Sequence, residues 1–112
     1  MAGKKKSVSC DVETTLRIIG GKWKVLVIYF LQDGTKRFNQ LHQSLGGISH
    51  RTLVKQLREL ERDGIVSRKV YLQIPPKVEY SLTKVGHQLK PVLEAMHIWG
   101  ERFGPRSAKP GS

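Results

Sequence analysis

The chain has 112 residues, a length that fits one compact domain. Lys and Arg number 20 against 9 acidic residues, which gives a formal net charge of +11. This excess predicts a polyanionic partner, either nucleic acid or an anionic membrane surface. Hydrophobic residues make up 38% of the chain, so a folded domain is expected rather than a disordered one.

Composition also disfavours several classes of protein. The longest apolar run, "VLVIYFL", is shorter than the roughly 18 residues of a membrane-spanning helix. No apolar signal core follows the basic start of the chain, so a cytoplasmic location is expected. Cys10 is the single cysteine, which excludes an internal disulfide framework and a thiolate cluster for zinc.

Residues 1–34 predict a tail followed by two helices. Residues 1–9 contain three lysines and no core pattern, and we interpret them as a flexible basic tail. In "DVETTLRIIGG", the apolar residues Val12, Leu16 and Ile19 recur at helical spacing before a pair of glycines ends the helix. The next segment, "KWKVLVIYFLQDG", is apolar nearly all round and predicts a central second helix.

Residues 37–64 predict a helix-turn-helix unit. A short extended piece is followed by a helix from about Asn39, its expected N-cap, to Leu45. After a pair of glycines, Ser49 is a suitable N-cap for a fourth helix that runs to Asp63. Two helices joined by a short turn that contains glycine are typical of this unit.

The pattern changes after residue 65. Two alternating segments surround "QIPP" and predict a β-hairpin, with apolar positions at Val66, Val70, Leu72, Val78, Tyr80 and Leu82. Thr83 can cap a last helix that reaches Phe103, and Pro91 should kink or split it. The expected fold is mainly α with a small β-hairpin, an α+β domain over residues 10–103, followed by a flexible tail over residues 104–112.

The fourth predicted helix separates apolar from basic side chains. At about 100° per residue, Leu53, Leu57 and Leu60 fall on one side. The opposite side carries what we call the basic row: Arg51, Lys55, Arg58 and Arg62. Glu59 and Glu61 are expected at the flanks, so the basic row lacks interleaved carboxylates. A solvated helix face usually mixes signs, and it remains the alternative interpretation.

A helix of this size fits the major groove of B-DNA, where its first turns normally reach the base edges. The base-reading candidates are therefore Ser49, His50, Arg51, Thr52 and Lys55. Arg58 and Arg62 are expected at phosphates. In the hairpin, a β-wing could reach flanking DNA through Arg68, Lys69, Gln73 and Lys77. The alternative is that the hairpin only covers the core and keeps its charges in solvent.

Taken in order, these segments resemble the bacterial HxlR-type winged helix-turn-helix transcriptional regulators, which are MarR-like. The resemblance runs from about Cys10 to Gly100 and is carried by "GGKW", "ISHRTLVKQLRELE" and "IPPKVEYSLT". It implies a homodimer that binds operator DNA as a two-fold unit, here expected to be a nucleoid-associated repressor. It also implies a dimer interface formed mainly by the first and last helices.

The sequence is consistent with such an interface. Met96, Trp99 and Phe103 are large apolar residues near a chain end, where a small domain has little left to cover them. Together with Leu16 of the first helix they are the expected dimer contacts. The alternative is that these side chains fold back on their own core.

The resemblance further implies that Cys10 could act as a thiol sensor of oxidants or electrophiles. The family usually has proline after this cysteine, whereas Asp11 follows here. A neighbouring carboxylate disfavours the thiolate, while nearby lysines and a helix N-terminus favour it. Any disulfide would join Cys10 to its counterpart in a second subunit or to a small thiol. The alternative is a small, partly buried residue at the start of the first helix.

Other classes of function have weaker support. No enzyme, metal site or cofactor is expected, because the histidines at 42, 50, 87 and 97 lack ligand spacing and no phosphate-binding loop is present. A membrane-surface protein is disfavoured because Glu94 and Glu101 lie on the polar face of the last helix. A protein-interaction module is a further alternative, although it would not need the basic row.

Overall fold

The computed structural model describes residues 8–105. Most of the two expected tails, residues 1–7 and 106–112, lies outside these described residues. The first helix, α1, covers Val8–Ile19, so the expected tail boundary after residue 9 is wrong by two residues.

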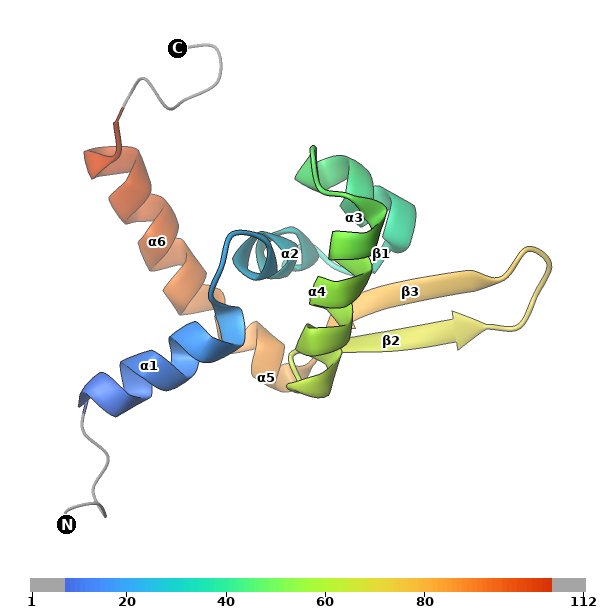
Figure 1. The fold of residues 1–112 in the computed structure, drawn as a ribbon, viewed down its shortest axis with the longest axis horizontal. Helices are drawn as coiled ribbons and strands as arrows, with labels where there is room; N and C mark the ends of the chain where they lie inside the picture. Colours follow the sequence, from blue (N-terminus) through green and yellow to red (C-terminus); the bar gives the residue numbers. More distant parts are fainter. Residues whose placement is uncertain (1–7, 106–112) are drawn as a thin grey trace.

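Helix α2 (Trp23–Leu31) lies at the centre of the molecule, as its nearly uniform apolar sequence predicts. It buries Val27, Ile28 and Leu31 against the leucines of α3 (Phe38–Leu45) and α4 (His50–Arg62). Figure 1 shows α3 and α4 on one side of α2, while α1 and the last helix extend on the other side.

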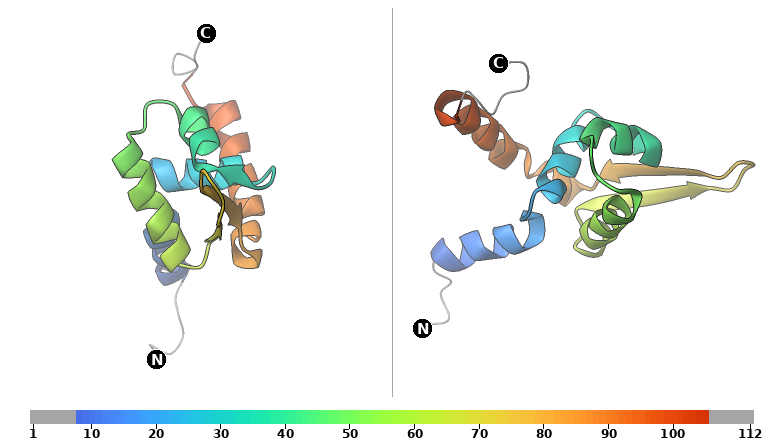
Figure 2. Two further views of the ribbon diagram at one scale, coloured as in Figure 1. Left: turned by 90° about the vertical axis from the view of Figure 1, so that its right-hand side faces the viewer. Right: turned by 45° about the horizontal axis from the view of Figure 1, so that its top comes forward.

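The sheet has three antiparallel strands in the order β1-β3-β2: β1 (Lys36–Arg37), β2 (Val66–Tyr71) and β3 (Lys77–Leu82). The predicted hairpin is confirmed, and Figures 1 and 2 show it projecting away from the helices. The alternating pattern extended one residue too far, because β2 ends at Tyr71. Leu72 lies in the connecting loop with 97% of its surface exposed.

The expected start of α3 is also wrong. The helix begins at Phe38, and Asn39 lies inside its first turn. The cause is the pairing of β1 with β3, which keeps the backbone extended through Arg37. The backbone N–H of Arg37 then donates to Gln40 Oε1 at 2.8 Å, so the side chain of Gln40 completes the helix start.

The last helix is split, as Pro91 predicts, into α5 (Lys84–His87) and α6 (Lys90–Phe103). Pro91 falls in the first turn of α6, where its missing N–H is tolerated. Thr83, which directly follows β3, connects this strand with two other elements. Its hydroxyl accepts from the N–H of Gly86 in α5 at 3.0 Å, and it donates to the carbonyl of Gly64, which follows α4, at 2.6 Å.

Candidate nucleic-acid interface

The turn between α3 and α4 places the recognition helix as the sequence predicts. Gly46 and Gly47 have φ angles of +50° and +86°, which favour glycine, and Ile48 is buried between them and α4. Ser49 caps α4 and accepts from the N–H of Thr52 at 3.0 Å. The Ser49 hydroxyl also donates to Thr52 Oγ1 at 2.9 Å, so these two candidate base readers already bond to each other.

The predicted separation of the two faces of α4 is present. Leu53, Leu57 and Leu60 are at most 1% exposed, while every member of the basic row is exposed. The predicted absence of carboxylates beside this row is wrong. Lys55 Nζ lies 3.8 Å from Glu59 Oε2, and Arg62 donates to both carboxylate oxygens of Asp63 at 3.2 and 3.3 Å. Within residues 8–105, Arg51 and Arg58 form no ion pair.

Glu59 is held mainly by a lysine from another helix. Lys24 of α2 is 8% exposed, and its Nζ lies 2.6 Å from Glu59 Oε1. This hydrogen bond, helped by the charges of Lys24, Lys55 and Arg62, lowers the pKa of Glu59 against the opposing effect of burial. Lys24 therefore compensates most of the negative charge of Glu59. Lys55 lies near the other carboxylate oxygen, at a longer distance.

Arg62 is held at the end of α4. Its hydrogen bonds to Asp63 raise the pKa of the guanidinium, with a further contribution from the charge of Asp63. Such a pair is solvent-exposed at the arginine and gains little free energy. A phosphate group could replace Asp63 as the partner of Arg62 without leaving a buried charge unpaired.

Two lysines of the wing lie close to an aromatic ring or a carboxylate of the wing itself. Lys69 Nζ and Lys77 Nζ lie 5.1 and 4.2 Å from the centroid of the Tyr71 ring. Lys77 Nζ also lies 3.8 Å from Glu79 Oε2, and its side chain is only 23% exposed. Arg68 and Lys69 are exposed, as is Gln73 in the loop. Lys77 is thus the least accessible of the predicted wing contacts.

A cavity of about 260 Å³ separates α4 from the wing. Arg58 and Arg68 line it from the two sides together with Glu61 and Tyr80, and Arg68 Nε lies 3.5 Å from Glu61 Oε1. Burial raises the pKa of Tyr80, with Arg68 and Arg58 opposing this shift and Glu61 adding to it. Glu61 therefore orients the wing arginine toward the recognition helix.

His50, a predicted base reader, belongs to a ring cluster at the helix-turn-helix. Its imidazole centroid lies 4.6 Å from that of Phe38 and 5.2 Å from that of His42. The structure thus brings together two histidines from separate predicted helices. The described residues contain no group of three or more His, Cys, Asp or Glu side chains suited to a metal ion.

The outer helices carry the predicted dimer contacts on their surface. Leu16 of α1 and Met96, Trp99 and Phe103 of α6 are 50–65% exposed. Only Leu93 of α6 is buried, so the alternative that these side chains fold back on their own core is wrong. Cys10 is exposed in the first turn of α1, so the alternative of a partly buried residue at this position is wrong. Figure 2 shows α1 and α6 diverging from the rest of the domain.

Sequence reasoning missed Lys24, Glu61 and Tyr80. Lys24 lies inside an apolar run, and its partner is on a helix far along the chain. Tyr80 was recognised only as an apolar strand position. A single polar residue within a run as apolar as "WKVLVIYFL" is the one local signal that could have pointed to a buried ion pair.

A helix-turn-helix with a basic second helix, followed by a β-hairpin, defines a winged helix-turn-helix DNA-binding protein. The chain belongs to the HxlR-like helix-turn-helix family, whose model matches residues 18–108. The resemblance and the fold class deduced from the sequence are therefore confirmed. The protein is a DNA-binding transcriptional regulator.

Similar proteins agree with this assignment. The uncharacterized HTH-type transcriptional regulator YdeP of Bacillus subtilis (strain 168) is 56% identical over 100 residues, which cover 89% of this chain and 78% of YdeP. The redox regulator HypR in its oxidized form is 55% identical with a TM-score of 0.79, covering 83% of this chain and 96% of HypR. The reduced form is 54% identical with a TM-score of 0.80, covering 82% and 91%. None of the described helices has the length and apolarity needed to cross a membrane.

Proposed function

We propose that the protein is a homodimeric repressor that inserts α4 into the major groove of operator DNA and lays its wing on flanking DNA. The observation that carries this proposal is the exposed basic row, which lies opposite the buried leucines of the same helix. The role is non-enzymatic, in keeping with relatives that are named as transcriptional regulators. Binding to the chromosome would place the protein in the cytoplasm, with the nucleoid.

The proposed contacts fall into two groups. Base edges are contacted by the first turns of α4 through Ser49, His50, Arg51, Thr52 and Lys55. Phosphates are contacted by the end of α4 and by the wing through Arg58, Arg62, Arg68, Lys69 and Lys77. Arg51 is the principal base reader, because it is exposed, near the helix start and outside any ion pair of the described residues. Arginine can make paired hydrogen bonds to guanine in the major groove.

The proposed dimer interface consists of α1 and α6. The large exposed side chains Leu16, Met96, Trp99 and Phe103 need an apolar partner, and a second copy offers an identical surface. The rings of Trp99 and Phe103 pack against each other with centroids 5.5 Å apart, so they would enter the interface as one unit. In a two-fold dimer, the recognition helices would address half-sites about one helical turn apart.

The direct test is binding to duplex DNA from immediately upstream of the protein's own gene. Fluorescence anisotropy is measured with increasing salt and with an excess of unrelated duplex. Specific binding that survives the competitor, with the protein dimeric in sedimentation, is the expected result. Affinity that is equal for all duplexes would overturn the role of a sequence-specific repressor and leave a non-specific basic domain.

A second function is favoured by the similarity to the redox regulator HypR, which is solved in an oxidized and a reduced form. Cys10 is exposed on α1, a helix of the proposed dimer interface. Two Cys10 thiols from the two subunits would lose two protons and two electrons to one hydrogen peroxide molecule. A disulfide forms, and the peroxide is reduced to two water molecules.

This redox function predicts a peroxide-induced covalent dimer on a non-reducing gel, together with an altered affinity for the operator. Dithiothreitol should reverse both changes, and Cys10→Ser should abolish both. Unchanged operator binding by the oxidized wild type would contradict the redox function without affecting the proposal of a repressor.

A further inference from the structure

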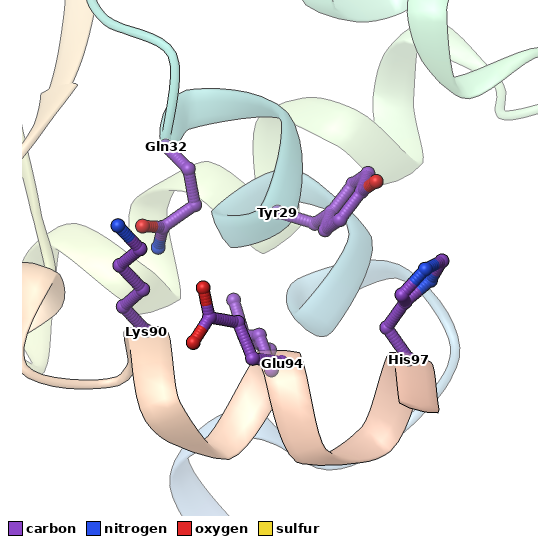
Figure 3. A pocket seen from close by; sticks show the side chains of 6 residues that line it. Tyr29, Gln32, Lys90, Glu94 and His97 are labelled. Carbon is purple, nitrogen blue, oxygen red and sulfur yellow. The ribbon is translucent and has the colours of Figure 1, made fainter. Parts of the chain in front are cut away.

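A second cavity lies between α2 and the first half of α6. It has a volume of about 240 Å³ and is lined by Tyr29, Gln32, Lys90, Leu93, Glu94 and His97. Figure 3 shows the ends of Gln32, Lys90 and Glu94 gathered on one side of the cavity, with Tyr29 and His97 on the other side. The lining thus combines hydrogen-bonding groups at one end with an apolar wall formed by Leu93 and the ring of Tyr29.

The polar end of this cavity is unsatisfied. Gln32 Nε2 is the buried side-chain atom of the described residues that has no hydrogen-bond partner. Such an orphaned donor is unfavourable unless an acceptor occupies the adjacent space. Lys90 and Glu94 are not paired with each other or with any other side chain of residues 8–105. The amide of Gln32 and the exposed, oppositely charged side chains of Lys90 and Glu94 therefore face the same small volume.

This set of groups selects one chemical class of occupant. A simple anion would meet the carboxylate of Glu94, and a simple cation would meet the ammonium of Lys90. A purely apolar molecule would leave Gln32 Nε2 without an acceptor. A small zwitterion satisfies all three groups, with its carboxylate toward Gln32 and Lys90 and its ammonium toward Glu94. An apolar side chain of the occupant would then contact Leu93 and Tyr29.

The cavity lies on an edge of α6 that faces away from Trp99 and Phe103, whereas Met96, the other proposed dimer contact of this helix, lies closer to Leu93. At about 100° per residue, Lys90, Glu94 and His97 share one edge, while Trp99 and Phe103 lie roughly opposite. A partner subunit on Trp99 and Phe103 would therefore leave this edge accessible. Because Leu93 alone is buried, the packing of α6 on α2 depends on few contacts, and an occupant of the cavity would add to them.

We infer that the cavity between α2 and α6 is an effector site for a small amino-acid-type zwitterion with an apolar side chain. Occupancy fixes the angle at which α6 crosses α2, and this angle sets the spacing of the two recognition helices. The effector role rests on the proposed homodimeric repressor. Binding to the cavity itself does not.

The test uses L-phenylalanine as the probe with the full-length protein and no DNA. In ¹⁵N–¹H NMR spectra, the amides of Gln32 and Leu93 should shift in a saturable manner, with a Kd below about 1 mM. Two analogues are matched controls: 3-phenylpropanoate lacks the amine and 2-phenylethylamine lacks the carboxylate. Each should bind at least about tenfold more weakly, because each leaves one charge of the cavity unpaired. Equal binding of all three, or no saturable shift with L-phenylalanine, would overturn the site.

Two variants locate the probe. Gln32→Leu and Glu94→Gln should each weaken L-phenylalanine binding by at least about tenfold, whereas Glu13→Gln on α1 makes the same change of charge elsewhere and should have no effect. Operator affinity is then measured with and without saturating L-phenylalanine. A change of at least about threefold that is absent in Glu94→Gln is expected. Probe binding without such a change would overturn the effector role, whereas a protein with no operator binding in any condition would contradict the proposed repressor instead.

Discussion

Helices α4 and α6 have similar lengths, 13 and 14 residues, but opposite relations to solvent. Helix α4 buries three leucines completely and exposes a row of cations. Helix α6 buries only Leu93 and exposes Trp99 and Phe103, each with more than 60% of its surface in solvent. The apolar side chains of α4 are covered by the rest of the domain, whereas most of those of α6 are not.

The domain therefore presents two kinds of helix surface, a cationic one on α4 and an apolar one on α6. The cations of α4 are exposed to water, and Lys55 and Arg62 also lie beside carboxylates, so this surface is stable in the free protein. A fully buried aromatic side chain removes about 150–250 Å² from water, so the exposed rings of α6 favour association with a protein surface. Substitutions can disrupt each surface separately. Those on α6 should change the oligomeric state, and those on α4 should change DNA binding alone.

The largest effect is expected from removing the apolar surface of α6. The double variant Trp99→Ser with Phe103→Ser should be monomeric in sedimentation, because aromatic residues dominate the energy of most interfaces. Operator affinity should fall by more than about 100-fold, since two linked half-sites become two independent ones. Ile98→Ser is the matched control, since Ile98 is 49% exposed but lies on another edge of α6. A double variant that remains dimeric would place the interface elsewhere.

Removing one cation of α4 should weaken DNA binding without changing the oligomeric state. Arg51→Ala should cost about 1–3 kcal/mol of specific binding free energy and relax the preference at one base pair. Anisotropy with a set of single-base operator variants measures both effects. Arg102→Ala removes the same charge from α6 and should leave the sequence preference intact. Unchanged affinity of Arg51→Ala would show that α4 does not read bases through this residue.

The next largest effect on operator affinity is expected from Lys24, the buried partner of Glu59 in α4. In Lys24→Met, Glu59 loses its nearest cation, so its charge is compensated by Lys55 of the basic row instead. Operator affinity should fall about tenfold, and adding Glu59→Gln should restore most of it; a double-mutant cycle measures this coupling. Lys22→Met changes an exposed lysine of the same segment and is the control. If Glu59→Gln fails to rescue a variant of normal thermal stability, the influence of Lys24 on DNA binding is not exerted through Glu59.

The ion pair between Lys24 and Glu59 should make the free energy of unfolding depend on pH. The pKa of Glu59 is lower in the folded protein than in the unfolded chain, so its contribution is fully present above the unfolded pKa. It is lost as the pH falls through the lowered, folded pKa. Urea unfolding over this acidic range should therefore show a smaller pH dependence for Glu59→Gln than for the wild type.

The smallest effect is expected in the wing. Lys77→Ala should weaken binding to all DNA sequences alike and reduce the slope of log affinity against log salt by about one. The loss should be modest, because Lys77 is only partly exposed and already lies near Glu79 and the ring of Tyr71. A loss confined to the specific operator would instead place Lys77 at a base edge.

Local patterns predicted those elements whose limits depend on local chemistry. Ser49 and the leucines of α4 defined the recognition helix, and Pro91 defined the division of the last helix. The prediction failed at Asn39, where a strand partner more than 40 residues away keeps the chain extended. It failed again at Leu72, because alternation alone does not show where two strands stop pairing.

The candidate site was predictable only in part for the same reason. The basic row follows from helical periodicity, which is a property of one segment. The ion pairs of Lys55 with Glu59 and of Arg62 with Asp63 also lie within that segment. The pairs that join separate elements depend on where α2, α4 and the wing meet, and no local pattern contains that information. Lys24 and Glu59 lie 2.6 Å apart in space but on separate helices, and Glu61 meets Arg68 across the start of the wing. The residues that modulate the charge of α4 therefore became visible only in the folded protein.

The hydroxyl of Thr83 has a mechanical consequence. This single oxygen joins the carbonyl that follows α4 to the first turn of α5, and the strand that ends beside it is the second strand of the wing. It therefore ties together the end of α4, the wing and α5, the short helix that precedes α6. A movement of α6 that displaces α5 would therefore shift the end of α4 and the wing together.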